Sequence, residues 1–183
     1  MIRVMDNIGL VYTNGHAIDE KGERLYQLLP DGFKEKNSPG EILLNCYIRS
    51  PSSTMVRKNI IERTGLFKIG FQSMDHDMWI KMAELSRFYY VAECLLGYRI
   101  HSGQQSLRRR QWEDGFPILH EACRRYPYGF SLKRRRLAVL YYRLAEHDWK
   151  QGRYPRAMWN YVLAGIHDLN RAFKTLLCLK KLS

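Results

Sequence analysis

The segment FQSMDHDMWIKM, residues 71–82, places two aspartates, a histidine and a tryptophan at the predicted start of an amphipathic helix. Carboxylates at such a position can cap the helix, bind a metal or act as a general base. Taken alone, Asp75 and Asp77 are explained by capping, because acidic residues accept hydrogen bonds from the free N–H groups of a first helical turn. Taken alone, His101 is explained as a structural or surface histidine. The choice for Asp75 therefore depends on the elements around it.

The first part of the chain alternates short apolar runs with turn signals. IGLVYT, residues 8–13, is a predicted strand, and HAIDEKGERL is a predicted hairpin in which Gly22 takes a positive φ. A short helix is predicted at EILLNCYI, and PSSTMVRK is a predicted strand that leads into the helix NIIERTG. Apolar residues at helical spacing predict a helix over residues 76–87, and RFYYVAECLLGYRIH predicts two more strands around residues 88–100. This order indicates an α/β or mixed α+β fold.

The second part of the chain differs from the first in charge and in pattern. Residues 1–107 carry 13 Lys and Arg against 12 Asp and Glu, whereas residues 108–183 carry 17 against 6. Three or four helical segments are predicted in the basic part, within residues 111–126, 131–152, 154–169 and 170–182. We therefore expect two domains, residues 1–107 and a basic helical appendage over residues 108–183.

Composition excludes several classes of protein. No stretch approaches the roughly 18 uninterrupted apolar residues of a membrane span, and the N-terminus lacks the apolar core of a secretion signal. We therefore expect a cytoplasmic protein, soluble or peripheral at the inner face of the membrane. The four cysteines are far apart and form no CxxC pair, which disfavours a zinc site and a disulfide framework. They are expected to be reduced and mostly buried.

Six segments occur in one line over about 100 residues: IGLVYTNG, AIDEKGE, ILLNCYI, SSTMVRKNIIERTGLF, MDHDMWIKMAE and GYRIHSGQQS. This order resembles the second half of the catalytic domain of family 2 glycosyltransferases, which use nucleotide-sugar donors and have the GT-A fold. The family signatures at these places read roughly GxFD, ED-x-D-L-W-x-R and Y-R-x-H-x-x-x-S. The resemblance implies that residues 1–107 form the C-terminal half of such a domain.

The resemblance also implies roles for particular residues. Asp75 falls on the second acid of the family's Glu-Asp pair, the expected general base that deprotonates the acceptor hydroxyl. Arg99 lies at the family's Tyr-Arg position, where a guanidinium supports carboxylates or the phosphates of the donor. His101 matches the histidine that approaches the metal or the diphosphate. Trp79 is expected to pack in the core, and Lys81 to pair with a nearby acid. Asp77 and His76 are then left as helix-start and surface residues.

Two departures and one absence accompany the resemblance. Met74 stands where the family has Glu, and Lys68 stands where the GxFD acid is usual, so contacts with the acceptor are expected to differ. No Asp-x-Asp motif precedes IGLVYTNG. DHD at residues 75–77 matches the Asp-x-Asp pattern, but it lies at the position of the family's base motif and is not taken as the nucleotide-binding motif. The chain is therefore expected to be the C-terminal part of a longer enzyme. Strands without their central neighbours would leave an exposed sheet edge and an apolar face.

The first functional hypothesis is a partial inverting glycosyltransferase, incomplete without its donor-binding half. The complete enzyme would use a divalent metal (Mg or Mn), a nucleotide-sugar donor and a saccharide or lipid-linked acceptor. The alternative is a non-catalytic interaction or membrane-surface-binding protein, in which Asp75 is only a cap. For the basic helices three interpretations stay open: a solvated face, contact with an anionic membrane surface through residues 108–183, and nucleic-acid contact, which is disfavoured because no binding motif accompanies the charge.

Overall fold

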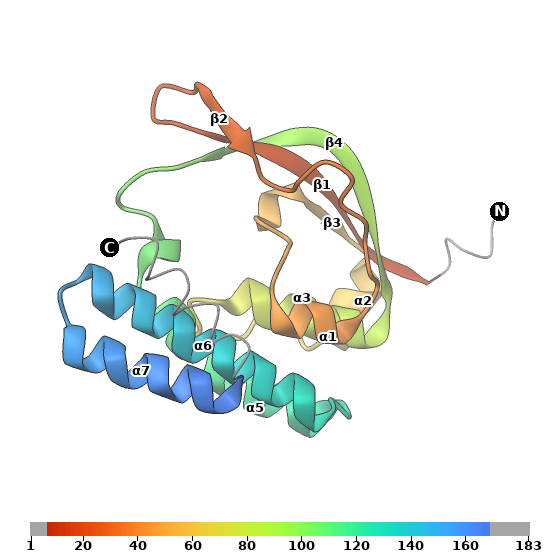
Figure 1. Ribbon diagram of the computed structural model, residues 1–183. Helices are drawn as coiled ribbons and strands as arrows, with labels where there is room; N and C mark the ends of the chain where they lie inside the picture. The colour runs from red at the N-terminus through yellow and green to blue at the C-terminus, as the bar shows by residue number, and fades with distance from the viewer. Residues whose placement is uncertain (1–6, 169–183) are drawn as a thin grey trace. The chain divides into compact units, whose positions relative to one another are not determined.

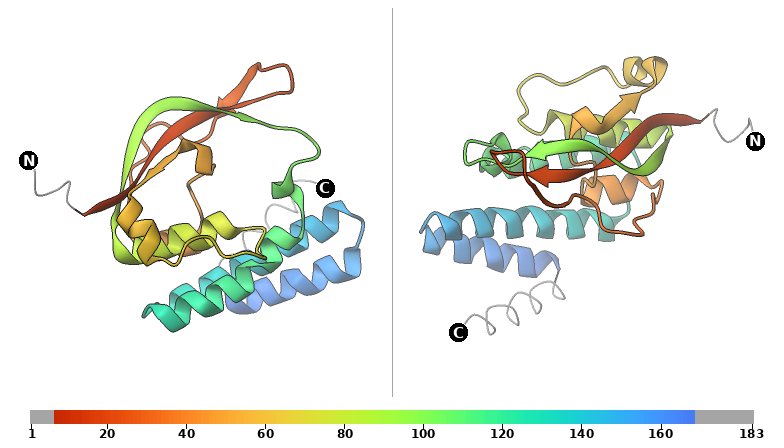
Figure 2. Two further views of the ribbon diagram at one scale, coloured as in Figure 1. Left: turned by 180° about the vertical axis from the view of Figure 1, so that it is seen from behind. Right: turned by 90° about the horizontal axis from the view of Figure 1, so that it is seen from above.

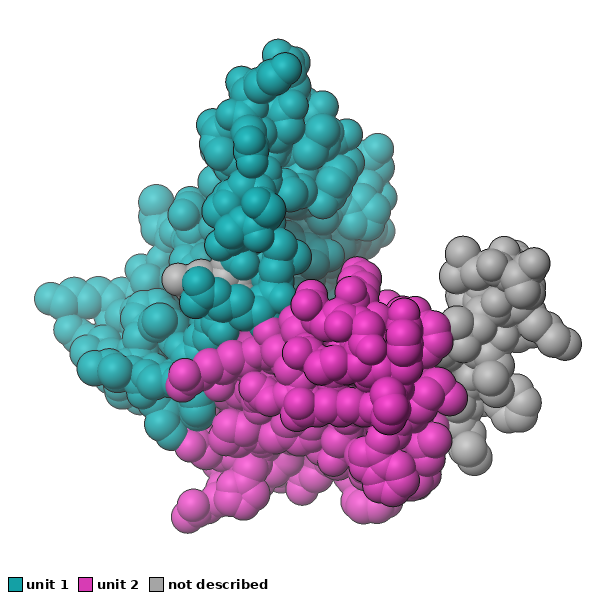
Figure 3. Space-filling view, turned by 90° about the vertical axis from the view of Figure 1, so that its left-hand side faces the viewer, with its two compact units in different colours: residues 1–108 teal, residues 109–183 magenta. Residues whose placement is uncertain are grey.

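The computed structural model describes residues 7–168, and its fold is of the mixed α+β class that the sequence predicts. The chain divides into two compact units, residues 1–108 and 109–183, which are coloured separately in Figure 3. The strands are β1 (Ile8–Ile18), β2 (Arg24–Gln27), β3 (Thr54–Val56) and β4 (Arg87–Arg99). The helices are α1 (Pro39–Leu44), α2 (Lys58–Arg63), α3 (Met74–Leu85), α4 (Arg110–Glu113), α5 (Gly115–Arg125), α6 (Phe130–Lys150) and α7 (Tyr154–His167), with short 3-10 turns η2 (Pro51–Ser53) and η3 (Gln105–Leu107).

β1 is the central strand of a mixed four-stranded sheet in the first unit (Figure 1). It pairs in parallel with β4, and antiparallel with β3 near its start and with β2 near its end. Leu10, Tyr12 and Ala17 of this strand are buried, as expected for a strand with neighbours on both edges. The predicted hairpin between β1 and β2 is confirmed, and Gly22 in its turn has a φ of 93°.

β4 is one long strand, so the prediction of two strands around residues 88–100 is wrong. Its pairing with β1 shifts register at three places, and such irregularities let a strand bend without ending. Figures 1 and 2 show β4 curving alongside β1 over its whole length. Within residues 7–168, β1 is the strand that pairs with β4, and Leu95 and Tyr89 on β4 are exposed. β4 therefore carries exposed apolar side chains, whereas the open sheet edge and apolar face expected of a chain without its donor-binding half stay predictions.

α3 contributes most of the helical core of the first unit. It contacts β1, β4, α1 and α2, and Trp79 in its second turn is 1% exposed. The prediction that Trp79 is a core residue is thus confirmed. α1 lies beside α3 in Figure 1 and contributes the buried Ile42 and Leu43. The first turn of α3, which carries the candidate base, is therefore anchored by packing on both the sheet and a neighbouring helix.

The second unit is helical throughout its described part. α6 and α7 run antiparallel as a hairpin (Figure 2), and Gly152 in the connecting turn has a φ of 72°. Buried alanines on facing sides, Ala145 on α6 and Ala157 and Ala164 on α7, allow the two helices to approach closely. The predicted helix over 111–126 is two helices, α4 and α5. The predicted helix over 170–182 lies outside the described residues.

Two further expectations concern the whole chain. No helix within residues 7–168 combines the length and the apolar character needed to cross a membrane. Cys46, Cys94 and Cys123 are free thiols, as expected, but they are half-buried rather than mostly buried. Cys178 lies outside the described residues.

Candidate active site

Asp75 lies in the first turn of α3, where its carboxylate accepts a hydrogen bond from the backbone and is partly shielded from water. The Oδ1 atom accepts a hydrogen bond of 2.8 Å from the backbone N–H of His76. Burial raises the pKa of the Asp75 carboxyl, and hydrogen bonds from backbone N–H groups only partly offset this effect. A half-buried carboxylate with a raised pKa holds a proton more tightly than an exposed aspartate, which suits a group that accepts protons.

Asp77 is a structural residue of the same helix. It is completely buried, and its Oδ2 atom lies 2.6 Å from Nζ of Lys81, one turn further along. The contact is an ion pair whose angles are not those of a hydrogen bond. The prediction that Lys81 pairs with a nearby acid is confirmed. Because a fully buried carboxylate cannot reach a substrate, Asp77 is excluded as the base.

His76 is buried, so its prediction as a surface residue is wrong. Its Nε2 atom lies 2.8 Å from the carbonyl oxygen of Ile42 in α1. The first turn of α3 packs against α1, and a carbonyl buried at that contact requires a donor. His76 supplies this donor and joins the two helices immediately next to Asp75.

The loop before Asp75 presents apolar side chains to solvent. Leu66, Phe67, Ile69 and Met74 are all exposed. Leu66 has a φ of 63°, a conformation that a branched side chain rarely adopts and that costs on the order of 1–3 kcal/mol. The surface that adjoins Asp75 along the chain is therefore apolar and conformationally constrained.

Arg99 and His101 line one open pocket, with a volume of about 350 Å³. The pocket lies at the end of β4 and includes hydroxyl and amide side chains. Its lining residues are Ser50, Ser52, Leu96, Gly97, Tyr98, Arg99, His101, Gln104 and Ser106. Nη1 of Arg99 donates to the carbonyl oxygens of Asp19 and Glu20, at 2.8 Å each. The guanidinium is therefore positioned by the β1–β2 turn.

The structure brings Arg99 and His101 together, but Asp75 does not line their pocket. Within residues 7–168, no three His, Cys, Asp or Glu side chains come close enough to hold a metal ion. Ser50 and Gln104 were not singled out from the sequence. Ser50 is recognisable only as the residue before a Pro-Ser-Ser turn, and Gln104 only as part of SGQQS. The roles of Asp75, Arg99 and His101 stay predictions.

A cluster of tyrosines, of which Tyr12 is buried and Tyr47 and Tyr90 are half-buried, fixes the loop between β2 and α1. The hydroxyls of Tyr12 and Tyr47 donate to the two carboxylate oxygens of Glu35, at 2.6 and 2.5 Å. Burial, with the added effect of the Glu35 hydrogen bond and charge, raises the pKa of both tyrosines above the ordinary range. Phe33 and Tyr90 extend the cluster through ring contacts. The cluster has a structural role, and no motif in the sequence indicated it.

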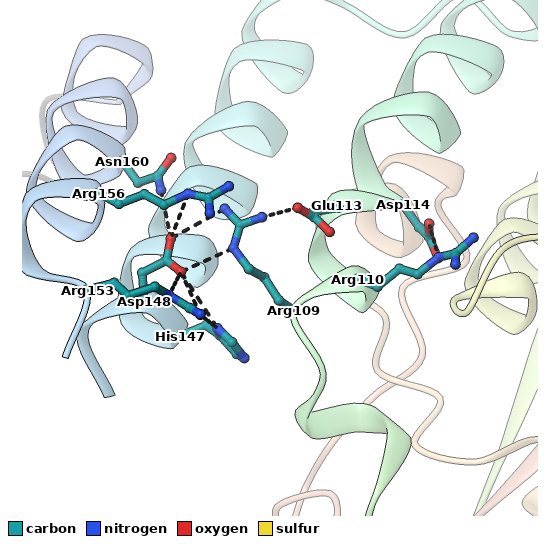
Figure 4. Close-up of polar contacts among 9 residues, drawn as sticks. All are labelled: Arg109, Arg110, Glu113, Asp114, His147, Asp148, Arg153, Arg156 and Asn160. Atoms are coloured by element: carbon teal, nitrogen blue, oxygen red, sulfur yellow. Dashed lines mark hydrogen bonds and ion pairs between the residues drawn. The ribbon is translucent and has the colours of Figure 1, made fainter. Parts of the chain in front are cut away.

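A second charged cluster lies in the helical unit (Figure 4). Asp148 on α6 is completely buried. It accepts hydrogen bonds from Arg109 and Arg153, at 3.2 and 3.0 Å, and from Asn160 at 3.3 Å. Burial alone would raise the pKa of Asp148, but the hydrogen bond and charge of Arg109, with the charges of Arg153 and Arg156, outweigh it and lower the pKa. The cluster joins α6 to α7 and to the segment that precedes α4.

Comparison with known proteins relates the chain to glycosyltransferases. It is 29% identical over 107 residues to the O-antigen biosynthesis glycosyltransferase WbnJ of Escherichia coli, over 56% of this chain and 40% of that protein. It is also 29% identical over 98 residues to the uncharacterized glycosyltransferase RP339 of Rickettsia prowazekii (strain Madrid E), over 52% of this chain and 31% of that protein. The chain thus spans less than half the length of these curated relatives. No family model matches it.

Proposed function

We propose that the chain is part of a family 2 glycosyltransferase that transfers a sugar from a nucleotide-sugar donor to a saccharide or lipid-linked acceptor. The observation that carries this proposal is the similarity to two glycosyltransferases over about half of the chain. The half-buried carboxylate of Asp75, at a helix start that the His76 contact ties to α1, is a group suited to the reaction.

In the proposed reaction Asp75 is the general base. Its carboxylate removes the proton of the acceptor hydroxyl while that oxygen attacks the anomeric carbon of the donor sugar. The bond from the anomeric carbon to the diphosphate breaks on the opposite side, and the nucleoside diphosphate leaves with the electron pair. The anomeric configuration is therefore inverted. The raised pKa of Asp75 makes its conjugate base stronger than that of an exposed aspartate.

The pocket at the end of β4 is suited to anionic or hydroxylated groups. Within residues 7–168, the Arg99 guanidinium makes its hydrogen bonds through Nη1, which leaves Nε and Nη2 available to a ligand. A guanidinium with free N–H groups, next to Ser50 and Gln104, can donate to phosphate or sugar oxygens. We assign donor phosphate contacts to Arg99 as part of the proposal.

The described residues do not by themselves make a site for Mg²⁺ or Mn²⁺. These cations prefer several oxygen ligands, and no group of three metal-binding side chains gathers around His101 within residues 7–168. No step of the proposed reaction is therefore assigned to a metal held by these residues. His101 would at most complete a ligand set whose carboxylates lie elsewhere.

The non-catalytic alternative is favoured by a different observation, the exposed apolar side chains of the sheet. Met55 on β3 and Leu95 on β4 are 76% and 67% exposed. Exposed apolar surface of this kind is found at interaction sites. The two hypotheses differ in the role of Asp75, which is the general base in the first and only a helix cap in the second.

The proposal is tested by changing Asp75→Asn in the complete gene product and measuring release of nucleoside diphosphate from a panel of nucleotide sugars with a membrane-extract acceptor. Loss of a general base lowers the rate by about 10²–10⁴-fold. The control is Asp31→Asn, which removes an exposed carboxylate from a loop of the same unit. Transfer that is undiminished in Asp75→Asn would exclude Asp75 as the base and favour the non-catalytic hypothesis.

A further inference from the structure

One face of α7 is apolar and exposed along the whole helix. Tyr154, Met158, Val162 and Ile166 recur at every fourth position, which places them on one side of the helix. These four and the neighbouring Trp159 are 50% to 64% exposed. The side that contacts α6 is formed instead by buried residues such as Ala157, Asn160 and Ala164. The large apolar side chains of α7 therefore point away from the core of their own unit.

This face is not an ordinary solvated helix surface. Between Tyr154 and Ile166 the chain carries a single charged side chain, Arg156, whereas helix faces in contact with water are normally rich in charge. Trp149, at the end of α6, extends the face because its ring packs against Tyr154 with centroids 5.0 Å apart. Large apolar side chains that gather exposed on one side of a helix mark an interaction site.

The charges around the face indicate the kind of partner. Lys150 ends α6, Arg153 directly precedes α7 and Arg156 lies in the first turn of α7. All three are exposed, and Arg153 and Arg156 also pair with Asp148. Arg134 lies at its other end, where it donates to the carbonyl of Ile166 at 2.5 Å. Asp168, just past the helix, is the only acidic residue between 149 and 168. Basic residues therefore flank an apolar face that also bears two tryptophans and a tyrosine.

A lipid surface matches this arrangement better than a protein partner does. Tryptophan and tyrosine are favoured at the boundary between lipid headgroups and acyl chains, and aliphatic side chains between them insert more deeply. Arginine and lysine at the rim attract anionic headgroups, and their long side chains reach the headgroup level from the sides of the helix. An interfacial helix is characterised by this combination of apolar face and basic flanks.

We propose that the second unit binds an anionic lipid surface through α7, with the helix lying in the plane of the surface and its apolar face inserted. The inserted residues are Tyr154, Met158, Trp159, Val162 and Ile166. The basic residues at the rim supply the preference for anionic lipid. This role is independent of the reaction proposed for Asp75, because no residue of the first unit takes part in it.

The test is flotation of the complete chain with vesicles of phosphatidylcholine containing phosphatidylglycerol, compared with vesicles of phosphatidylcholine alone. We expect binding to the anionic vesicles that weakens as salt is added, because exposed charges are screened. Val162→Glu places a charge in the middle of the face and is expected to reduce binding about tenfold or more, because burying one aliphatic side chain contributes about that factor. Ile69→Glu is the control, since Ile69 is 98% exposed and lies in the first unit.

Lys150→Glu gives a second measurement that does not alter the apolar face. It is expected to weaken binding at low salt and to make binding less dependent on salt. The emission of Trp159 is expected to shift to the blue on anionic vesicles, and the shift should be smaller in Trp159→Phe. Circular dichroism of each variant establishes that the helices are retained.

Three results would overturn the proposal. The first is failure of the chain to float with anionic vesicles. The second is equal binding by Val162→Glu and the parent chain; loss of binding on removal of residues 169–183 alone would then assign the lipid contact to that segment. The third is a dimer in sedimentation that Val162→Glu dissociates, without lipid binding by the parent, which would make the face a contact between two copies of the chain.

Discussion

Replacing Asp148 with asparagine should destabilise the helical unit by breaking a buried ionic cluster. Asp148 is completely buried, and its oxygens accept hydrogen bonds from Arg109, Arg153 and Asn160 (Figure 4). The substitution keeps the shape of the side chain and one acceptor oxygen but removes the negative charge. The arginines then face each other without a counter-charge, and Arg109 is the most affected because its side chain is only 16% exposed.

The magnitude follows from how deeply each partner is buried. Removing one partner of a buried ion pair costs roughly 3–5 kcal/mol. The side chains of Arg153 and Arg156 are 45% and 57% exposed, so water screens their share of the interaction. We therefore expect Asp148→Asn to lower the free energy of unfolding by about 3 kcal/mol, the lower end of this range. With a urea dependence of about 1–3 kcal/mol per molar, the unfolding midpoint falls by about 1–3 M.

The assay is urea unfolding followed by circular dichroism, with Glu146→Gln as the control. Glu146 lies on the same helix and pairs with Arg143 at 3.0 Å, but both side chains are partly exposed. Loss of that surface pair should cost less than about 1 kcal/mol. Equal stabilities of Asp148→Asn and Glu146→Gln would refute the view that the buried cluster holds α6 and α7 together.

The difference in stability between the parent chain and Asp148→Asn depends on pH with a definite sign. The pKa of Asp148 is lowered in the folded protein, so its ionised form is favoured by folding. The stabilisation is fully present above the ordinary aspartate pKa of about 3.9 and is lost as the pH falls through the lowered folded value. The parent chain and Asp148→Asn should therefore differ most at neutral pH and converge in acid.

Three further predictions concern the first unit. In the complete enzyme, kcat/KM should fall as the pH is lowered through the raised pKa of Asp75, because only the ionised carboxylate accepts a proton; a profile flat through that range would contradict its role as base. Glu35→Gln should lower the free energy of unfolding by about 1.5–3 kcal/mol, measured by urea denaturation, because the buried Tyr12 and the half-buried Tyr47 lose a charged acceptor. Gly15→Ala should cost about 1–3 kcal/mol in the same assay, because the added Cβ would lie 2.6 Å from the carbonyl oxygen of Leu96 on the paired strand; an unchanged midpoint would mean that β1 and β4 can move apart.

Local features of the fold were predictable because they depend on neighbours in the chain. The β1–β2 hairpin follows from a turn in which Gly22 adopts a positive φ. α3 follows from apolar residues at helical spacing, and the burial of its Trp79 was implied by the family resemblance. The pairing of Lys81 with a nearby acid, which the resemblance implied, is made with an acid one helical turn away. Each of these is decided within a few residues.

Features that depend on distant parts of the chain were mispredicted or missed. The sequence predicts two strands where the structure has the single strand β4. The register shifts in its pairing with β1 depend on the partner strand, so the residues of β4 alone do not reveal them. The prediction of His76 as a surface residue is wrong because its acceptor, the carbonyl of Ile42, is 34 residues away in the sequence. The cluster around Asp148 was missed because Arg109 reaches it across 39 residues.

By itself the sequence determined the mixed α+β class, the basic helical second part and the likeness to glycosyltransferases that singled out Asp75, Arg99 and His101. Tertiary structure alone decided how these groups differ. In the folded chain Asp77 is buried, and Asp75 is half-buried with a raised pKa. Arg99 and His101 line one pocket, which Asp75 does not line. The physical reason is that burial and the approach of side chains depend on which elements pack together, whereas residue type and spacing specify only the elements themselves.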